Sequence, residues 1–184
     1  KYYKALINLA KASHHSLQSS KAIVLLKDAM KLDQKRYEAY ETMGLILRKI
    51  GKPKEALEFF KTAKTLKGDV TDNLMNMSIC CQDLGKNEEA LKYLKEMINE
   101  KPDCAKAYRL MSILKNYLPE DQDIPRMQSL YEMNLNEKEH IQICFALAKV
   151  FKDLGQIKKS FDFLKEGNAY QKSLLNYEIS QDQK

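Results

Sequence analysis

A repeat of 34 residues constrains the fold of this chain more than any other feature of its sequence. Gly51 and Gly85 lie 34 residues apart, and each is followed four residues later by Glu-Ala-Leu. Phe60 aligns with Leu94 at the same spacing. Self-similarity at a fixed period of roughly 20 to 50 residues indicates repeated supersecondary units. Extending the period in both directions divides the chain into five units, at residues 3–36, 37–70, 71–104, 105–140 and 141–174.

Each unit has the pattern of two helices joined by a turn. Ala56, Phe60 and Ala63 stand at i, i+4 and i+7, which places them on one face of a helix. Gly51 and Gly85 end the first helices of their units, where a left-handed backbone costs glycine little. At these positions the sequence resembles the tetratricopeptide repeat, whose unit has about 34 residues. We therefore expect an all-α fold, a right-handed α-α superhelix of five helical hairpins without strands.

The repeat also predicts which side chains are buried and where helices begin. Pro119 and Pro125 flank an acidic loop in the fourth unit, so we expect its second helix to begin with Asp123 as the cap. Asn136 and Glu139 predict a capping box at the start of the fifth unit. The predicted core comprises Leu9, Ala22, Leu26, Met43, Ala56, Phe60, Met77, Ala90, Leu94, Met111, Leu147 and Leu164.

The charge of the chain, formally +6, raises nucleic acid as a possible partner. Only four of the 31 basic residues are Arg, the residue best suited to forked contacts with phosphates and bases. Residues 71–104 carry a formal charge of −3, which interrupts any continuous basic stripe. We therefore interpret the lysines as solvated surface residues and expect no nucleic acid partner. No apolar run approaches the roughly 20 residues that a membrane span needs, so we also expect no membrane partner.

The cysteines and histidines do not have the spacing of a metal site. No two cysteines are separated by the two-residue gap of a zinc site, and His14, His15 and His140 are not placed to complete one. We expect reduced, structural cysteines and a cytoplasmic protein. The adjacent Cys80 and Cys81 leave a redox role open as the alternative. We expect no catalytic residue, no metal and no cofactor in this segment.

The first helices of stacked hairpins line a concave side, where partners usually bind. Positions two, five and nine of each unit should face this groove. In the first unit they are Lys4, Ile7 and Lys11, and in the later units Glu38, Glu41, Leu45, Asp72, Met75, Ile79, Lys106, Arg109, Ile113, Gln142, Phe145 and Lys149. Apolar side chains between charged ones suit a peptide; an ordinary solvated face is the alternative. Asn76 and Lys106 fall on two positions of a carboxylate clamp, but the other clamp positions hold unsuitable residues, so we do not expect a clamp.

A more specific resemblance covers roughly residues 71–180. The run from Cys144 to Lys149, reading Cys-Phe-Ala-Leu-Ala-Lys, and the later Glu166-Gly167-Asn168 are similar to the segment that precedes the catalytic domain in bacterial tetratricopeptide-repeat sulfotransferases. This resemblance implies a downstream α/β domain that binds 3′-phosphoadenosine 5′-phosphosulfate through a Gly-rich turn. The six glycines here are isolated from one another, so no catalytic residue of that family can be assigned to this sequence.

Two functions remain open from the sequence. The first is a scaffold that binds a peptide or partner surface in its groove, as the N-terminal module of a sulfotransferase-family protein. The alternative is a part of the enzyme in which the repeats help to recognise a protein acceptor substrate. We interpret the chain as a segment of a longer protein because it begins at Lys1 rather than Met. Residues 175–184 are then a tail that leads to a downstream domain. We expect Leu174 and Tyr177 to pack against that domain or against a second copy of the chain.

Overall fold

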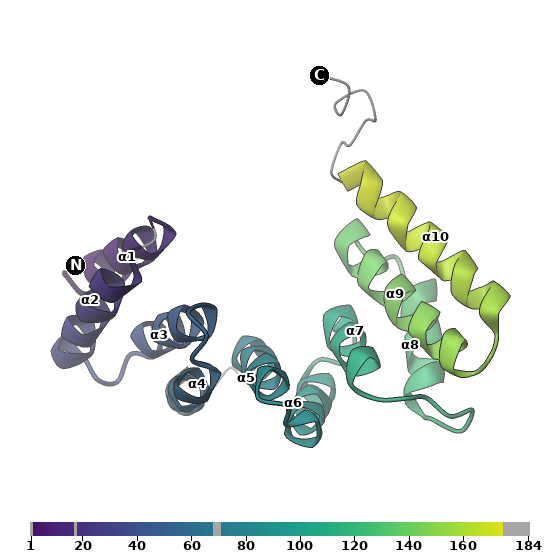
Figure 1. Cartoon of the computed structure of the whole chain (residues 1–184), viewed down its shortest axis with the longest axis horizontal. Helices are drawn as coiled ribbons and strands as arrows, with labels where there is room; N and C mark the ends of the chain where they lie inside the picture. Colours follow the sequence, from purple (N-terminus) through teal and green to yellow (C-terminus); the bar gives the residue numbers. More distant parts are fainter. Residues whose placement is uncertain (1, 17, 68–70, 175–184) are drawn as a thin grey trace. The chain divides into compact units, whose positions relative to one another are not determined.

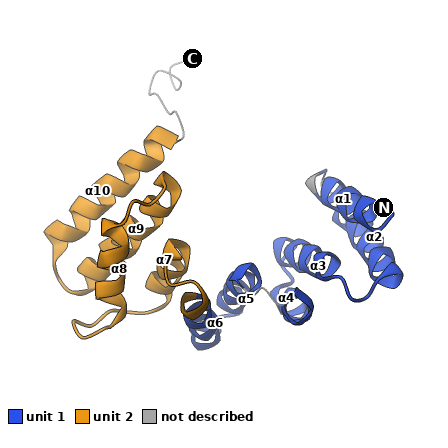
Figure 2. Ribbon diagram, turned by 180° about the vertical axis from the view of Figure 1, so that it is seen from behind, with its two compact units in different colours: residues 1–97 blue, residues 98–184 orange. Residues whose placement is uncertain are grey.

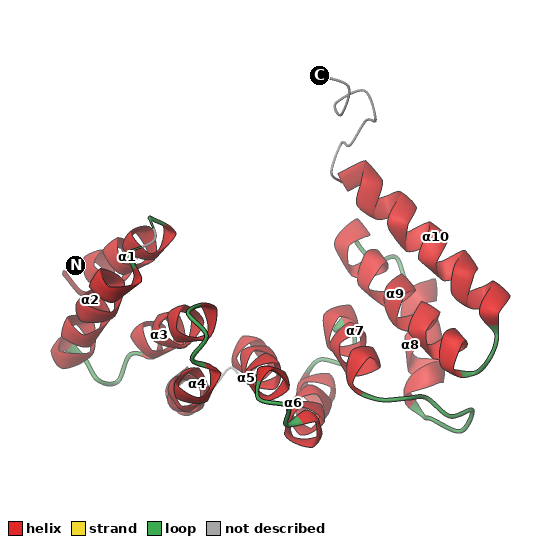
Figure 3. Cartoon of the chain, viewed as in Figure 1, coloured by secondary structure: helices red, strands yellow, loops and turns green. Residues whose placement is uncertain are grey.

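The described part of the computed structural model, residues 2–16, 18–67 and 71–174, consists of ten α-helices (Figure 1). No strand occurs within these ranges (Figure 3), so the predicted all-α fold of five helical hairpins is confirmed. None of the helices in these ranges is long and apolar enough to cross a lipid bilayer. The helices are α1 (Tyr2–His15), α2 (Ser19–Leu32), α3 (Tyr37–Lys49), α4 (Pro53–Lys67), α5 (Thr71–Asp83), α6 (Asn87–Glu100), α7 (Ala105–Leu114), α8 (Asp123–Glu132), α9 (Glu137–Asp153) and α10 (Ile157–Leu174).

The helices group into two compact units, Lys1–Met97 and Ile98–Lys184 (Figure 2). In unit 1, α1 packs on α2, and α3 packs on α4. In unit 2, α9 is the central helix, which packs against α7, α8 and α10. The predicted boundaries of the five repeats and of the tail at 175–184 stay predictions. The tail, including Tyr177, lies outside the described residues.

The hairpin of α3 and α4 shows how the repeat pattern produces close packing. Phe60 is fully buried on α4, and its ring lies against Gly44 of α3. A Cβ atom at Gly44 would lie only 2.7 Å from Cε1 of Phe60, so only glycine leaves room for this ring. Ala56 and Ala63, on the same face of α4 as Phe60, are also fully buried. Small residues in register with a large one therefore hold the two helices together.

Ten of the twelve predicted core side chains are buried, but the predictions for Leu9 and Leu164 are wrong. Leu9 is 49% exposed and Leu164 is 40% exposed. Leu9 lies in α1, the first described helix, and no described hairpin covers the face that buries Met43 one period later. In α10, the last described helix, Ser160 and Gly167 contact α9, whereas Leu164, between them on the same face, stays 40% exposed.

Three turns between paired helices depend on a glycine in a left-handed conformation. The φ angles of Gly51, Gly85 and Gly155 are 79°, 73° and 71°. Side chains with a Cβ rarely adopt this conformation, whereas glycine does so without steric cost. The helix-ending role predicted for Gly51 and Gly85 is thereby confirmed.

The two predicted helix caps have different outcomes. Asn136 caps α9: its side-chain oxygen accepts a hydrogen bond of 3.0 Å from the backbone N–H of Glu139, which confirms the cap. The Glu139 carboxylate accepts a hydrogen bond of 2.6 Å from the side-chain amide of Asn136. The prediction that Asp123 caps α8 is wrong by one residue. Asp123 is already helical, and Gln122 occupies the cap position without a side-chain hydrogen bond. The Asp123 carboxylate instead pairs with Lys115, at 3.0 Å.

Candidate functional site

The predicted groove residues of unit 1 lie on α1, α3 and α5, the first helices of the first three hairpins. On α1, Lys4 and Lys11 are exposed, whereas Ile7 is buried. Leu45 and Asp72 are exposed, while Glu38, Glu41, Met75 and Ile79 are half-buried. Thr42, one turn before Ile46 on α3, donates its hydroxyl hydrogen to the carbonyl oxygen of Glu38 at 2.7 Å. This face therefore presents apolar and acidic side chains together.

A cavity of about 350 Å³ lies in unit 1 between α1 and α3. Leu45, a predicted groove residue, forms part of its wall together with Thr42 and Ile46. The remaining lining residues all carry nitrogen donors: Lys11, His14, Arg48 and Lys49. Of these, only Lys11 was among the predicted groove positions, because Arg48 and Lys49 follow the last groove position of their helix.

The predicted groove residues of unit 2 lie on α7 and α9, which pack against each other. Lys106 and Ile113 are exposed, and Arg109, Gln142, Phe145 and Lys149 are half-buried. The guanidinium carbon of Arg109 lies 5.6 Å from the centre of the Phe145 ring, a cation–π contact between the two helices. Burial lowers the pKa of Arg109, but a guanidinium stays charged in proteins.

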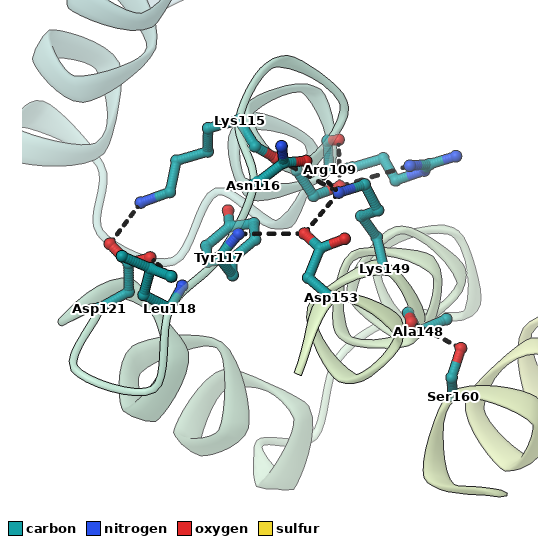
Figure 4. A network of polar contacts seen from close by, with 11 residues as sticks. Arg109, Lys115, Asn116, Tyr117, Leu118, Asp121, Ala148, Lys149, Asp153 and Ser160 are labelled. Carbon is teal, nitrogen blue, oxygen red and sulfur yellow. Dashed lines mark hydrogen bonds and ion pairs between the residues drawn. The ribbon is translucent and has the colours of Figure 1, made fainter. Parts of the chain in front are cut away.

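Lys149, one of the predicted groove residues, holds the connection between α7 and α8 (Figure 4). Its ammonium nitrogen lies 2.5 Å from Oδ2 of Asp153 and 3.3 Å from the side-chain oxygen of Asn116. The same Asp153 oxygen accepts a hydrogen bond of 3.0 Å from the backbone N–H of Tyr117. This lysine is thus engaged inside unit 2, and a partner would compete with Asp153 for it.

A second ion-pair cluster lies in the same loop. Lys115 contacts Asp121 at 2.7 Å and Asp123 at 3.0 Å. Burial alone would lower the pKa of Lys115, but the hydrogen bonds to both carboxylates outweigh it and raise the pKa above its ordinary value. The neighbouring Tyr117 is buried, and burial together with the nearby carboxylates raises the pKa of its phenol. These interactions give the loop a defined shape, which the sequence alone did not indicate.

Sequence reasoning missed a polar cluster between α8, α9 and α10. Nε2 of His140 lies 2.7 Å from one carboxylate oxygen of Glu166, and the Tyr131 hydroxyl donates a hydrogen bond of 2.8 Å to the other. The sulfur of Cys144 lies within 4.8 Å of the donor atoms of His140 and Glu166, and these three residues could hold a metal ion. Because Glu166 already binds both neighbours, hydrogen bonds suffice to explain the cluster. The i, i+4 spacing of His140 and Cys144 was the available signal.

The cysteines have the properties expected of structural thiols. Cys80, Cys81 and Cys144 are fully buried, and none of them forms a disulfide with another described residue. Burial raises the pKa of Cys80 to about 11 and that of Cys144 to about 12. Since the thiolate is the nucleophile and the redox-active form, these thiols are unreactive near neutral pH.

The N-terminal half of the chain is similar to a known protein family. The family model for anaphase-promoting complex, cyclosome, subunit 3 matches residues 2–97. These 96 residues are just over half of the 184 in the chain. The chain belongs to this family. A search of curated proteins found no match.

Solved structures agree on the fold. A tetratricopeptide repeat protein from Parabacteroides merdae is 21% identical, with a TM-score of 0.75, over 92% of this chain and 67% of its own. MamA from Desulfovibrio magneticus is 17% identical, with a TM-score of 0.70, over 94% of this chain and 97% of its own. YrrB, a tetratricopeptide-repeat protein with an unusual peptide-binding site, is 17% identical, with a TM-score of 0.65, over 90% of this chain and 84% of its own. At these identities the likeness establishes the tetratricopeptide fold.

Proposed function

We propose that this chain binds a peptide or the surface of a partner protein on the first-helix faces of its hairpins. The observation that carries the proposal is the presence of exposed apolar side chains on these helices. Leu45 on α3 is 40% exposed, and Ile113 on α7 is 49% exposed. Each lies on a helix that also carries charged groove residues. Membership in a family named for a subunit of a complex, and the peptide-binding site named for YrrB, support the same function.

Within each unit, the contacts suggest which groove residues matter most. In unit 1 we assign the partner to Leu45, Met75 and Ile79, with Glu38, Glu41 and Asp72 as charged contacts. In unit 2 we assign it to Ile113, Phe145 and Arg109, with Lys106 and Gln142 beside them. Lys149 makes a smaller contribution in this proposal, because its ammonium is already paired with Asp153.

Selection of peptides from a displayed random library on the full chain, followed by fluorescence polarisation, tests this function. Leu45→Glu and Ile113→Glu should each weaken the binding of selected peptides at least tenfold. Val24→Glu is the matched control, because Val24 is an exposed aliphatic residue on α2, a second helix. It should change the affinity less than twofold. Selected peptides that bind both groove variants normally but lose binding to Val24→Glu would contradict the proposal.

A second candidate, the connection with sulfotransferases, rests on the resemblance around residues 144–149 and 166–168. Packing accounts for part of this similarity, since a Cβ at Gly167 would lie 3.2 Å from Cβ of Cys144 and 3.1 Å from the Phe145 ring. In this second proposal the repeats recognise a protein acceptor for a downstream transferase domain. A strand followed by a Gly-rich turn with Ser or Thr, encoded shortly after residue 184, would support it. Its absence from the full gene would exclude it.

We also propose that the end of α10 docks against a downstream domain or a second copy of the chain. Leu174, the last residue of α10, is 40% exposed, and Tyr177 lies outside the described residues. Changing both residues to Glu should lower the mass measured by light scattering, or destabilise the full-length protein. If the unchanged fragment is already monomeric and the altered full-length protein keeps its stability, this docking does not occur.

A further inference from the structure

The charged side chains that line the cavity between α1 and α3 are all of one sign. Four of its lining side chains are basic or carry an imidazole, and none of the described residues that line it is acidic. Among the described residues, no carboxylate forms an ion pair with Lys11, Arg48 or Lys49. His14 is engaged locally, with Nδ1 3.0 Å from the Ser19 hydroxyl. Three positively charged side chains therefore line this cavity without a described carboxylate to balance them, which favours an anionic ligand.

Arg48, one of the residues that line this cavity, also carries an unpaired polar atom. Its Nε atom is buried and has no hydrogen-bond partner among the described residues. Leaving a buried donor unsatisfied costs on the order of 1–3 kcal/mol, so such donors are usually paired. A guanidinium is well suited to a carboxylate, because its planar fork can donate two parallel hydrogen bonds.

The walls and the size of the cavity narrow the class of ligand. Leu45 and Ile46 supply aliphatic surface beside the cations, and Thr42 supplies a hydroxyl. A volume of about 350 Å³ is near the lower end of ligand pockets, which begin at about 300 Å³. A side chain with an aliphatic stem and a terminal carboxylate matches both the aliphatic wall and the cations beside it. We propose that this cavity binds the side-chain carboxylate of an acidic residue in a peptide that lies along the groove. This inference rests on the proposed peptide-binding function and names the chemistry of one part of it.

A nucleic acid fits this site less well than an acidic peptide. Among the described residues that line the cavity, His14 is the only one with an aromatic ring, and it is already engaged, so these residues offer no platform for stacking a base. Glu38 and Glu41 lie one to two turns before Leu45 on the same helix. Their charges would repel a phosphate backbone that followed α3, whereas a peptide can place a single acidic residue in the cavity.

Two capped peptides test the proposal, and they differ only in whether one side chain ends in a carboxylate or in an amide. The probes are acetyl-Ala-Leu-Glu-Leu-Ala-amide and its counterpart with Gln in place of Glu. Titrated into the isotopically labelled full chain, the Glu peptide should shift the NMR signals of α1 and α3 residues around the cavity. Its dissociation constant should be at least ten times smaller than that of the Gln peptide. Raising the salt concentration should weaken the binding of the Glu peptide, because the attraction is electrostatic.

Variants then assign the binding to the cavity. Lys11→Gln and Arg48→Gln should each weaken Glu-peptide binding at least fivefold. Lys54→Gln is the matched control, since Lys54 is exposed on α4 and does not line the cavity. It should change the affinity less than twofold. Circular dichroism of each variant establishes that the helices are intact, and a variant that has lost them is replaced by Lys49→Gln.

Several results would overturn the assignment. One is equal binding of the Glu and Gln peptides, or an equal loss of affinity in Lys54→Gln. Another is binding only by a Gln peptide with a free C-terminus, which would point to a terminal carboxylate. Tighter binding of a single-stranded oligothymidylate would point to nucleic acid. Library-selected peptides that depend on Leu45 but not on Lys11 or Arg48 would overturn the cavity assignment and leave the proposed function intact.

Discussion

At the scale of single residues, Gly44 and Phe60 form a pair in which one member must be small because the other is large. Each residue alone would be unfavourable at its position. A glycine destabilises the interior of a helix, and the Phe60 ring needs more space than the surface of a neighbouring helix usually leaves. Together they bring α3 and α4 into close contact, with the buried ring lying over the bare backbone. Substitutions at Gly44 and Phe60 should therefore have strongly non-additive effects on the free energy of unfolding.

Phe60→Ala should lower the free energy of unfolding by about 3–5 kcal/mol, because it empties a fully buried site. Gly44→Ala should lower it by about 1–3 kcal/mol through overlap with the ring, despite the better helix propensity of Ala. In the Phe60→Ala background the overlap is gone, so Gly44→Ala should be neutral or stabilising. Urea denaturation of the four proteins measures all three values. An equal cost of Gly44→Ala in both backgrounds would show that the residues do not interact.

At the scale of elements, the connection between α7 and α8 depends on a residue from a third helix. Asp153 of α9 accepts hydrogen bonds from the backbone of Tyr117 and from Lys149. Asp153→Ala should lower the free energy of unfolding by about 1–3 kcal/mol, since it leaves both donors without this acceptor. Asp153→Asn should cost less, because the amide oxygen can still accept the bond from Tyr117.

Amide hydrogen exchange and urea denaturation measure the effect of these Asp153 variants. The amide of Tyr117 should exchange faster in Asp153→Ala than in the unchanged chain. Asp162→Ala is the control, because Asp162 is exposed on α10, where surface substitutions usually change stability by less than about 0.5 kcal/mol. Unchanged protection of Tyr117 in Asp153→Ala would mean that other contacts hold the loop.

The elements also show what the sequence could and could not predict. Local signals worked: Gly51 ends its helix and Asn136 caps its helix, since both effects involve only nearby backbone. Periodicity found the core wherever a unit has neighbours on both sides, and failed for Leu164 in the last described helix. The Asp153 contact with Tyr117 joins residues 36 positions apart, and a periodic pattern contains no information about such side-chain pairs.

The candidate site was predictable to a similar degree. The repeat indicated which helices carry the groove residues, because helix order follows from the period. It did not indicate that Lys149 is paired within unit 2 or that Arg48 lines a cavity. Whether a surface charge is paired depends on rotamers and on neighbouring helices, which are set only when the helices pack.

At the scale of the whole molecule, stability should fall at alkaline pH. Burial raises the pKa of Cys80 to about 11, and that of Cys144 and Tyr131 to about 12, above the ordinary values of 9.0 and 10.0. Folding therefore favours the protonated forms of these three side chains. The stability that they contribute is fully present below about pH 9. It is lost as the pH rises through the raised pKa values.

Urea denaturation between pH 7 and pH 11 measures this decline in the free energy of unfolding. A Cys80→Ala, Cys144→Ala double variant should be less stable at pH 7, because both thiols are buried, but should lose less stability between pH 9 and pH 11. Only the slope with pH is compared, so the lost packing does not obscure the result. The same slope in both proteins would mean that these thiols do not ionise on unfolding.

The loop between α7 and α8 has a consequence for how this sequence can diverge among relatives. The turns at Gly51, Gly85 and Gly155 each depend on one backbone conformation, so each glycine can be kept or lost independently of the rest of the chain. The loop depends instead on linked charges, Lys115 with Asp121 and Asp123. Losing one member leaves partly buried charges uncompensated, so these positions should change together across related proteins. Covariation in the fourth hairpin, and independent loss of the three glycines, is therefore the pattern to expect in an alignment of homologues.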